Sequence, residues 1–295
     1  MRFSEISTGY KFLEGGQVDS DGAIFFSDYA LGGVYRLDAA GVTRRWLEDV
    51  RGIGGTVLNG DGGLVVSGMD GIWLLDLDTG KRAPILLEVE GQRRGFNDIE
   101  GDGHGGFYAG TIDLAARAQQ RPPSYGELLH VTPDGRCTIL ARDIGAANGI
   151  GIDADRGMLY LSDTGTGIWR FPLPAPGMVG ERALLYPMAD SDGLAVDAGG
   201  IVWVAAWETG AVVRIDPATR EATRYPLPDG QAMTLAFGGP DWRDLYVFGG
   251  ADVLNPHTPA TASIYRARTD HAGRQAAKAA IRPTRDRSEA QPAMH

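Results

Sequence analysis

A turn followed by a short apolar strand recurs six times along the 295-residue chain, and this repeat limits the possible folds most strongly. The six copies begin at Asp19, Asn59, Gly101, Asp153, Asp197 and Gly238. Their starts are separated by 40, 42, 52, 44 and 41 residues, and a second strand-like segment follows each copy. A period near 40 residues with several short strands per repeat is typical of a β-propeller.

The 43 glycines agree with this interpretation, because Asp-Gly and Gly-Gly pairs supply the positive φ that tight hairpins need. A helical bundle is disfavoured, since each glycine inside a helix costs about 1 kcal/mol relative to alanine. We predict an all-β fold: a six-bladed β-propeller with four strands per blade, whose N-terminal strand closes the last blade. A β-sandwich with accidental similarity between the copies is the alternative. We expect one domain at 1–274 and a flexible tail at 275–295.

The net charge of −10 gives no electrostatic support to a role with nucleic acid or an anionic membrane. A single cysteine, Cys137, fits a reducing compartment, and the first residues lack the apolar core of a signal peptide. No apolar run is long enough to span a bilayer. We therefore expect a cytoplasmic protein, a monomer or small homo-oligomer, that acts on a small molecule.

One position in each repeat, about five residues before the turn, is expected to face the central channel. Side chains alternate along a strand, so equivalent positions point the same way. The six positions hold Glu14, Gly54, Asn97, Asn148, Asp192 and Thr234. They supply two carboxylates and two carboxamides, whereas the glycine is expected to leave space for substrate.

Two carboxylates that converge inside a protein need a partner, and no lysine or arginine occupies an equivalent position. A divalent cation would balance Glu14 and Asp192, with amide oxygens of Asn97 and Asn148 completing the site. Oxygen ligands suit calcium, magnesium or manganese, and a small shell with room for water also permits zinc. The alternative is local turn formation, because Asn-Gly and Asp-Gly pairs occur at two of these positions.

Six segments carry a resemblance to a known family. They are FLEGGQVDSDGAIFFSD from Phe12, FNDIEGDGHGGFYAGT from Phe96, ANGIGID from Ala147, LYLSDTGTGIWRF from Leu159, SDGLAVDAGGIVWVAAWETGAVVRIDP from Ser191 and AFGGPDWRDLYV from Ala236. Over about residues 12–265 the chain resembles the senescence-marker-protein, gluconolactonase and luciferin-regenerating-enzyme family. The resemblance implies a six-bladed propeller with one divalent metal in its channel, and hydrolysis of lactone rings. It further implies that Glu14, Asn148 and Asp192 are metal ligands and that Asn97 contacts metal or substrate.

Two positions depart from the family pattern. Many sugar lactonases of this family carry an arginine two residues before the matching asparagine, where it holds substrate hydroxyls. Gly95 stands there in this chain, and Arg94 is expected to substitute for that arginine if the loop bulges. Gly16 stands where the family commonly has proline, which is expected to alter only the local backbone.

Lactone hydrolysis needs an activated water and a stabilised oxyanion, and a divalent metal supplies both. By resemblance, Asp192 is both a metal ligand and the general base.

Tyr125 and Asp113 join Asn97 and Arg94 as candidate substrate contacts. The segment 112–125 is either a lid over the site or a loop on the surface. Other functions remain open: phosphotriester hydrolysis at the same metal, a non-catalytic calcium-binding propeller, and lyase or isomerase chemistry.

Overall fold

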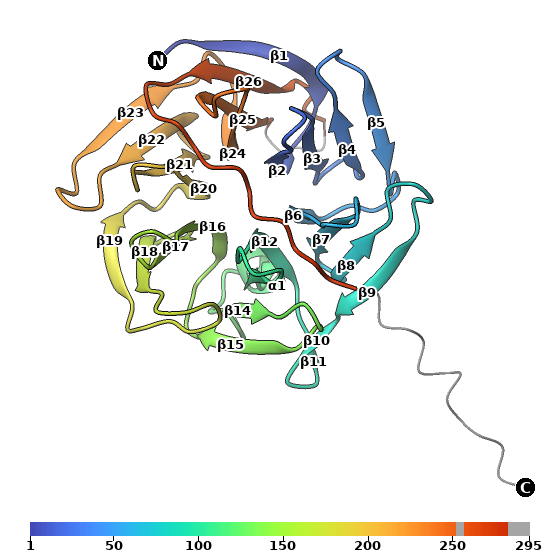
Figure 1. The fold of residues 1–295 in the computed structure, drawn as a ribbon, viewed down its shortest axis with the longest axis vertical. Helices are drawn as coiled ribbons and strands as arrows, with labels where there is room; N and C mark the ends of the chain where they lie inside the picture. Colours follow the sequence, from blue (N-terminus) through green and yellow to red (C-terminus); the bar gives the residue numbers. More distant parts are fainter. Residues whose placement is uncertain (252–256, 283–295) are drawn as a thin grey trace, which may run out of the picture.

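The computed structural model describes residues 1–251 and 257–282. Within these residues, 24 strands form six four-stranded antiparallel sheets, arranged around a central axis like the blades of a propeller (Figure 1). A short two-stranded ribbon and one helix complete the regular structure of the described residues. The predicted six-bladed propeller is confirmed.

Each of the first three blades is a meander that runs outward from the channel. Blade 1 contains β2 (Leu13–Val18), β3 (Ile24–Asp28), β4 (Val34–Leu37) and β5 (Thr43–Trp46). Blade 2 contains β6 (Ile53–Leu58), β7 (Leu64–Gly68), β8 (Gly71–Leu75) and β9 (Arg82–Leu86). Blade 3 contains β12 (Phe96–Gly101), β13 (Phe107–Thr111), β14 (Leu128–Val131) and β15 (Cys137–Ala141). The ribbon β10 (Glu88–Val89) and β11 (Gln92–Arg93) precedes blade 3, and α1 (Leu114–Ala118) lies between β13 and β14.

The last three blades follow the same plan, apart from the outermost strand of blade 6. Blade 4 contains β16 (Ala147–Asp153), β17 (Met158–Asp163), β18 (Gly167–Pro172) and β19 (Ala183–Pro187). Blade 5 contains β20 (Ser191–Val196), β21 (Val202–Ala206), β22 (Ala211–Ile215) and β23 (Ala222–Pro226). Blade 6 contains β24 (Gln231–Gly238), β25 (Asp244–Gly250), β26 (Ala262–Arg268) and the N-terminal β1 (Phe3–Tyr10).

The ring closes through pairing of the first strand of the chain with the last. β1 lies antiparallel to β26, from Phe3 opposite Ala267 to Tyr10 opposite Ala262 (Figure 1). The prediction that the N-terminus completes the last blade is therefore confirmed. Closure matters energetically because an open ring would expose the backbone groups of two strand edges.

The hydrophobic core is divided into layers between neighbouring blades. Val57 and Val65 of blade 2, for example, pack against Phe96 and Phe107 of blade 3. Corresponding clusters join blades 1 and 2, 3 and 4, 4 and 5, 5 and 6, and 6 and 1. Each inner strand is consequently held from both sides, which fixes the direction of its channel-facing side chains.

The end of the described chain corrects one prediction. Residues 272–282, here called the strap, are not a loose tail but cross one face of the propeller (Figure 1). Ala279 and Ile281 are buried, because they enter the layer between blades 2 and 3. The remainder of the predicted tail, 283–295, lies outside the described residues.

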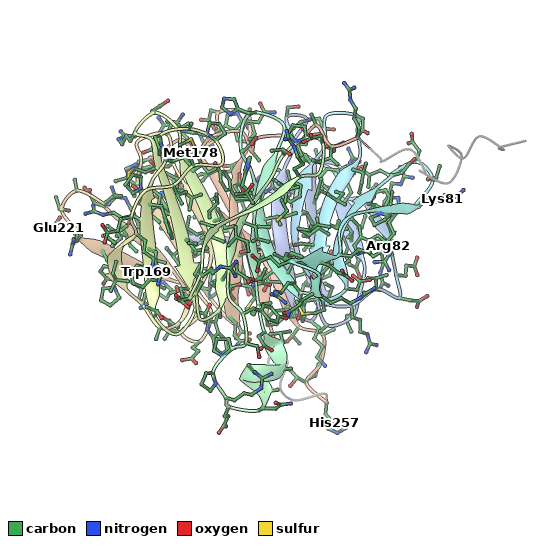
Figure 2. All side chains as sticks on the ribbon, turned by 90° about the horizontal axis from the view of Figure 1, so that it is seen from below. Lys81, Arg82, Trp169, Met178, Glu221 and His257 are labelled. Atoms are coloured by element: carbon green, nitrogen blue, oxygen red, sulfur yellow. The ribbon has the colours of Figure 1, made fainter. Side chains whose placement is uncertain are left out.

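The strap contacts a turn from every blade. The contacts are Lys278 with Asp19, the backbone of Ala279 with Leu58 and Gly60, Ala280 with Gly105, Arg274 with Asp155, Ala272 with Ala198, and Gly273 with Trp242. These turns follow the inner strands, whereas α1 follows the antiparallel β13 and projects from the opposite face (Figure 2). The two faces therefore differ: the strap covers one, and α1 stands beside the channel on the other. No helix among the described residues is long and apolar enough to cross a membrane.

Candidate metal centre in the channel

The six positions identified from the repeat all lie on the innermost strands, near the face that carries α1. Glu14, Asn97, Asn148, Asp192 and Thr234 are each less than a tenth exposed. In every blade the pairing of the innermost strand with its neighbour shifts register at this level. A bulge redirects side chains locally, and repeating it six times turns one residue per blade into the channel. We call these six residues the channel ring.

Hydroxyl side chains in or directly after the second strands fix the backbone of the ring. Ser67 donates a short hydrogen bond to the carbonyl of Asn97 in the next blade. Thr164 donates to the carbonyl of Ser191, next to Asp192, at 2.6 Å. These bonds cross from one blade to the next, so the positions of the ring residues depend on the closed propeller and not on a local turn.

The two carboxamides are oriented by hydrogen bonds of their own. The Asn148 amide nitrogen donates to Thr164 Oγ1 at 2.6 Å, which turns its Oδ1 toward Asn97. The Asn97 amide nitrogen donates to that oxygen and to the carbonyl of Ala147 at 3.1 Å. The amide oxygen of Asn148 is thus presented on the ring, where it can serve as a ligand.

Negative charge surrounds Glu14. Burial raises the pKa of Glu14 well above its usual value, and the nearby carboxylates of Asp192 and Asp98 raise it further. Burial alone raises the pKa of Asp98 to about 7. Every charge that acts on Glu14 here is negative, so a bound cation would relieve both the desolvation and the repulsion.

The donor set fits a hard divalent cation. No group of three or more His, Cys, Asp or Glu side chains among the described residues is arranged to hold a metal by itself. Binding at the ring therefore has to use amide oxygens and water besides Glu14 and Asp192. Oxygen-rich, partly hydrated coordination of this kind suits calcium or magnesium.

Gly54 does not leave an empty space for substrate, contrary to the prediction. A Cβ atom built on it would lie 2.4 Å from Asn97 Oδ1. The side chain of Asn97 therefore fills the space beside this glycine. Glycine is required here because the carboxamide of the next blade packs directly against the backbone.

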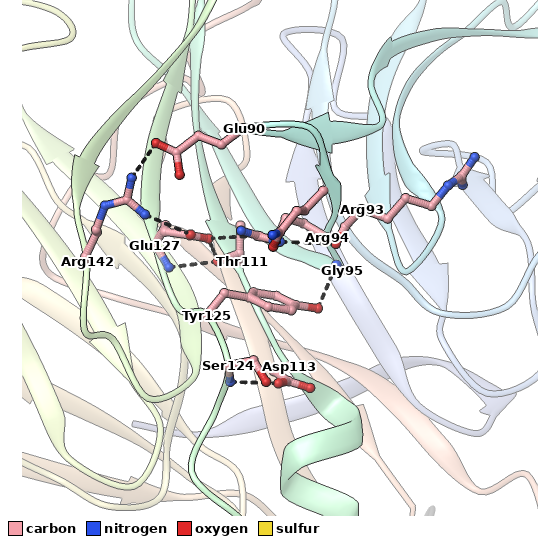
Figure 3. A network of polar contacts seen from close by, with 11 residues as sticks. Glu90, Arg93, Arg94, Gly95, Thr111, Asp113, Ser124, Tyr125, Glu127 and Arg142 are labelled. Carbon is pink, nitrogen blue, oxygen red and sulfur yellow. Dashed lines mark hydrogen bonds and ion pairs between the residues drawn. The ribbon is translucent and has the colours of Figure 1, made fainter.

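Arg94 belongs to a buried network that also contains Tyr125 (Figure 3). Its guanidinium lies 4.5 Å from the centre of the Tyr125 ring, and its Nε is 3.5 Å from Glu127 Oε2. Glu127 also accepts a hydrogen bond from Thr111 at 2.8 Å, and the Tyr125 hydroxyl accepts one from the Gly95 amide at 3.1 Å. The charge of Arg94 is thus taken up by Glu127, and the network holds the start of β12.

Asp113 caps α1 and ties the two ends of its loop together. One carboxylate oxygen accepts the Ala116 amide at 2.9 Å, and the other accepts the Ser124 amide at 2.9 Å and Arg121 at 3.2 Å. Burial opposes ionisation, but these donors prevail and lower the pKa of Asp113. Both oxygens are therefore engaged within the loop, and a direct substrate contact by Asp113 remains a prediction.

Sequence reasoning missed two residues at the ring. Tyr29 lies directly after β3, and burial followed by the charge of Glu14 raises its pKa to about 12. Thr164 lies after β17 and joins Asn148 to the next blade. Both come from the ends of second strands, so a register count along the first strands could not find them.

The fold and the ring match a known family. Residues 13–249 match the family model described as SMP-30/Gluconolactonase/LRE-like region. This match covers most of the chain and includes all six ring positions. The protein therefore belongs to the SMP-30/gluconolactonase/LRE-like family.

Proteins of similar sequence include two lactonases. The chain is 32% identical over 232 residues to a 6-deoxy-6-sulfogluconolactonase of Pseudomonas putida, covering 76% of this chain and 78% of the relative. It is 30% identical over 194 residues to pentonolactonase XacC of Haloferax volcanii, covering 60% and 63%. Among solved structures, a calcium-binding regucalcin of Agrobacterium tumefaciens superimposes with a TM-score of 0.81 at 25% identity, covering 95% of this chain and 98% of that one.

Proposed function

We propose that this protein is a divalent-metal-dependent hydrolase that opens the ring of a small lactone. The observation that carries the proposal is the pair of buried carboxylates, Glu14 and Asp192, on a ring with two oriented carboxamides. The lactonases among the relatives support the choice of substrate class. We infer a cytoplasmic protein that acts on an aldonolactone or a related small lactone.

Glu14, Asp192 and Asn148 would hold the cation, with Asn97 as the fourth oxygen donor. When bound, a divalent metal polarises the lactone carbonyl and lowers the pKa of an adjacent water. The chain itself supplies a buried carboxylate at a fixed position. The strap crosses the far end, which supports the proposal that substrate enters and product leaves on the face that carries α1.

Asp192 is the proposed general base. It removes a proton from the attacking water as the water oxygen bonds to the carbonyl carbon. The ring C–O bond then breaks, and the same proton is delivered to the departing ring oxygen, which yields a hydroxy acid. Tyr29 and Tyr125 lie on the proposed entrance side and are proposed to contact the substrate.

The test compares metal-free protein with protein reloaded separately with calcium, magnesium, manganese or zinc. Aldonolactones, aliphatic lactones, aromatic lactones and a phosphotriester are offered as substrates. We expect lactone hydrolysis that chelator abolishes and metal restores, and its loss in Asp192→Asn. The exposed Asp49 provides a matched control, because Asp49→Asn removes a carboxylate from the surface and not from the channel ring.

Two results would reject the proposal. The first is the absence of lactone hydrolysis with all four metals. The second is undiminished hydrolysis by Asp192→Asn. Hydrolysis of the phosphotriester and of no lactone would indicate that the same site is a phosphotriester hydrolase.

A further inference from the structure

A second level of the channel lies between the channel ring and the strap. A cavity of about 200 Å³ occupies it. Blades 1, 2 and 3 line the cavity with the polar residues Gln17, Thr56 and Glu100. Asp98, which directly follows the ring residue Asn97, also lines it. The facing positions on blades 4, 5 and 6 are small: Gly151, Ala195 and Ala236. Larger apolar residues such as Ile152, Val196 and Phe237 also line that side, so the cavity is polar on one side and apolar on the other.

Asp98 occupies a position that most blades keep free of side chains. The residue directly after the ring residue is glycine in four blades: Gly15, Gly55, Gly149 and Gly193. A Cβ atom on any of these glycines would come within 3.0 Å of the next inner strand. Blade 3 instead has Asp98 at this position, so it departs from the glycine that four of the blades share.

This carboxylate has no compensating partner. Asp98 is 6% exposed and lines the cavity, and no described residue donates a hydrogen bond or a positive charge to it. Burial raises the pKa of Glu100 to about 8; Gln17 opposes this shift and Asp98 adds to it. The side-chain oxygen of Gln17 is also buried without a donor.

The cation at the strap end does not balance these groups. Arg274 lines the same cavity, but it pairs with Asp155 and donates to the carbonyl of Ala198. Buried carboxylates are normally paired with a cation or coordinate a metal. Arg274 is the arginine that lines this cavity, and its charge is paired with Asp155. The cavity therefore keeps a net negative charge, which suits a bound cation.

We propose that this cavity is a second divalent-cation site, in which Asp98 and Glu100 are the charged ligands and Gln17 supplies an amide oxygen. Water completes the coordination: a water takes up roughly 30 Å³, so the cavity holds a partly hydrated ion. The absence of histidine and cysteine from its lining selects hard cations, calcium or magnesium. The site does not depend on which reaction the ring performs.

Metal stoichiometry tests this site. Metal-free protein is dialysed against calcium or magnesium, and bound metal per chain is measured by plasma mass spectrometry. We expect two ions per chain for the wild type, one for Glu100→Gln and one for Asp192→Asn, and none when both substitutions are combined. The exposed Glu88→Gln serves as a matched control and should retain two ions.

A second variant guards against misfolding. If Glu100→Gln does not fold, Asp98→Asn is measured in its place, again with one ion expected. Binding of at most one ion by the wild type, or of two ions by Glu100→Gln, overturns the second site. A failure of lactone hydrolysis is a separate outcome, since it would reject the proposed function while leaving the stoichiometry readable.

Discussion

The inner strands carry carboxylates at two levels, and the two levels differ in how their charge is balanced. At the turns beneath the strap, Asp19 pairs with Lys278 at 2.8 Å and Asp102 with His130 at 2.8 Å. Burial opposes ionisation of both, but hydrogen bonds and these partners prevail and lower each pKa. In the channel, burial raises the pKa of both Glu14 and Asp98, and nearby carboxylates raise that of Glu14 further.

This contrast distinguishes the turn carboxylates, which have a structural role, from the channel carboxylates, which we propose bind a cation. The turn carboxylates stabilise the apoprotein, because donors from the fold already satisfy them. The channel carboxylates cost free energy in the apoprotein, and the cation binding that we propose would recover that cost as binding free energy. Mutations at the two levels should consequently have opposite effects on the stability of the apoprotein.

The largest effect is expected from Asp192→Asn. Loss of the proposed general base should lower kcat by about 10²–10⁴-fold on the best lactone, while the fold is retained. The measurement is steady-state hydrolysis at saturating metal, with circular dichroism as the check on folding. Wild-type kcat in a correctly folded variant would remove Asp192 from the mechanism.

Removal of the strap should have the largest effect on stability. A chain ending after Gly273 loses the buried Ile281, worth about 1.5–3 kcal/mol, and several backbone hydrogen bonds of about 1 kcal/mol each. We expect the free energy of unfolding to fall by about 4 kcal/mol in denaturant titrations. A chain ending after Arg282 is the matched control, because it keeps every strap contact. Equal stability of the two truncated chains would show that the strap does not brace the ring.

Asp102→Asn probes the turn level. His130 and the amides of His104 and Gly106 all contact the Asp102 carboxylate, so the substitution should cost about 2 kcal/mol at pH 7. The folded pKa is below the unfolded value, so the ionised form stabilises the fold at neutral pH and loses this advantage on acidification. The stability difference from the wild type should therefore close below about pH 4. A difference that is independent of pH would contradict this account.

Glu14→Gln probes the channel level and should have the smallest effect, in the opposite direction. Removing one of several repelling carboxylates should raise the apoprotein's free energy of unfolding by about 1 kcal/mol. Calcium should then stabilise the variant less than it stabilises the wild type. Thermal melts with and without calcium measure both changes, and a destabilised apoprotein would argue against the electrostatic comparison.

Much of this arrangement was accessible from the sequence, since the repeat fixes both the blades and the register. Glu14, Asn97, Asn148 and Asp192 lie together because each occupies the same bulge, so counting from the turn located them. The role of Gly54 was misjudged, since the count could not show that Asn97 would fill the adjacent space.

The strap was missed for a different reason. It binds mainly through the backbone of alanines, as with Ala279 against Leu58, and backbone hydrogen bonds leave no side-chain pattern in the sequence. The partner of Arg94, Glu127, comes from a position that no local motif indicates, whereas the partners of Asp113 all lie within its own loop. Tyr29 reaches the ring from the end of a second strand, a position the repeat count did not follow.

The most direct test is an anomalous difference map from crystals of the protein grown with manganese. The account predicts a peak in the channel ring between Glu14, Asn148 and Asp192, with none at the turn carboxylates Asp19 and Asp102. A ring without a peak, or manganese bound at the turn level instead, would contradict the assignment of the channel carboxylates to cation binding.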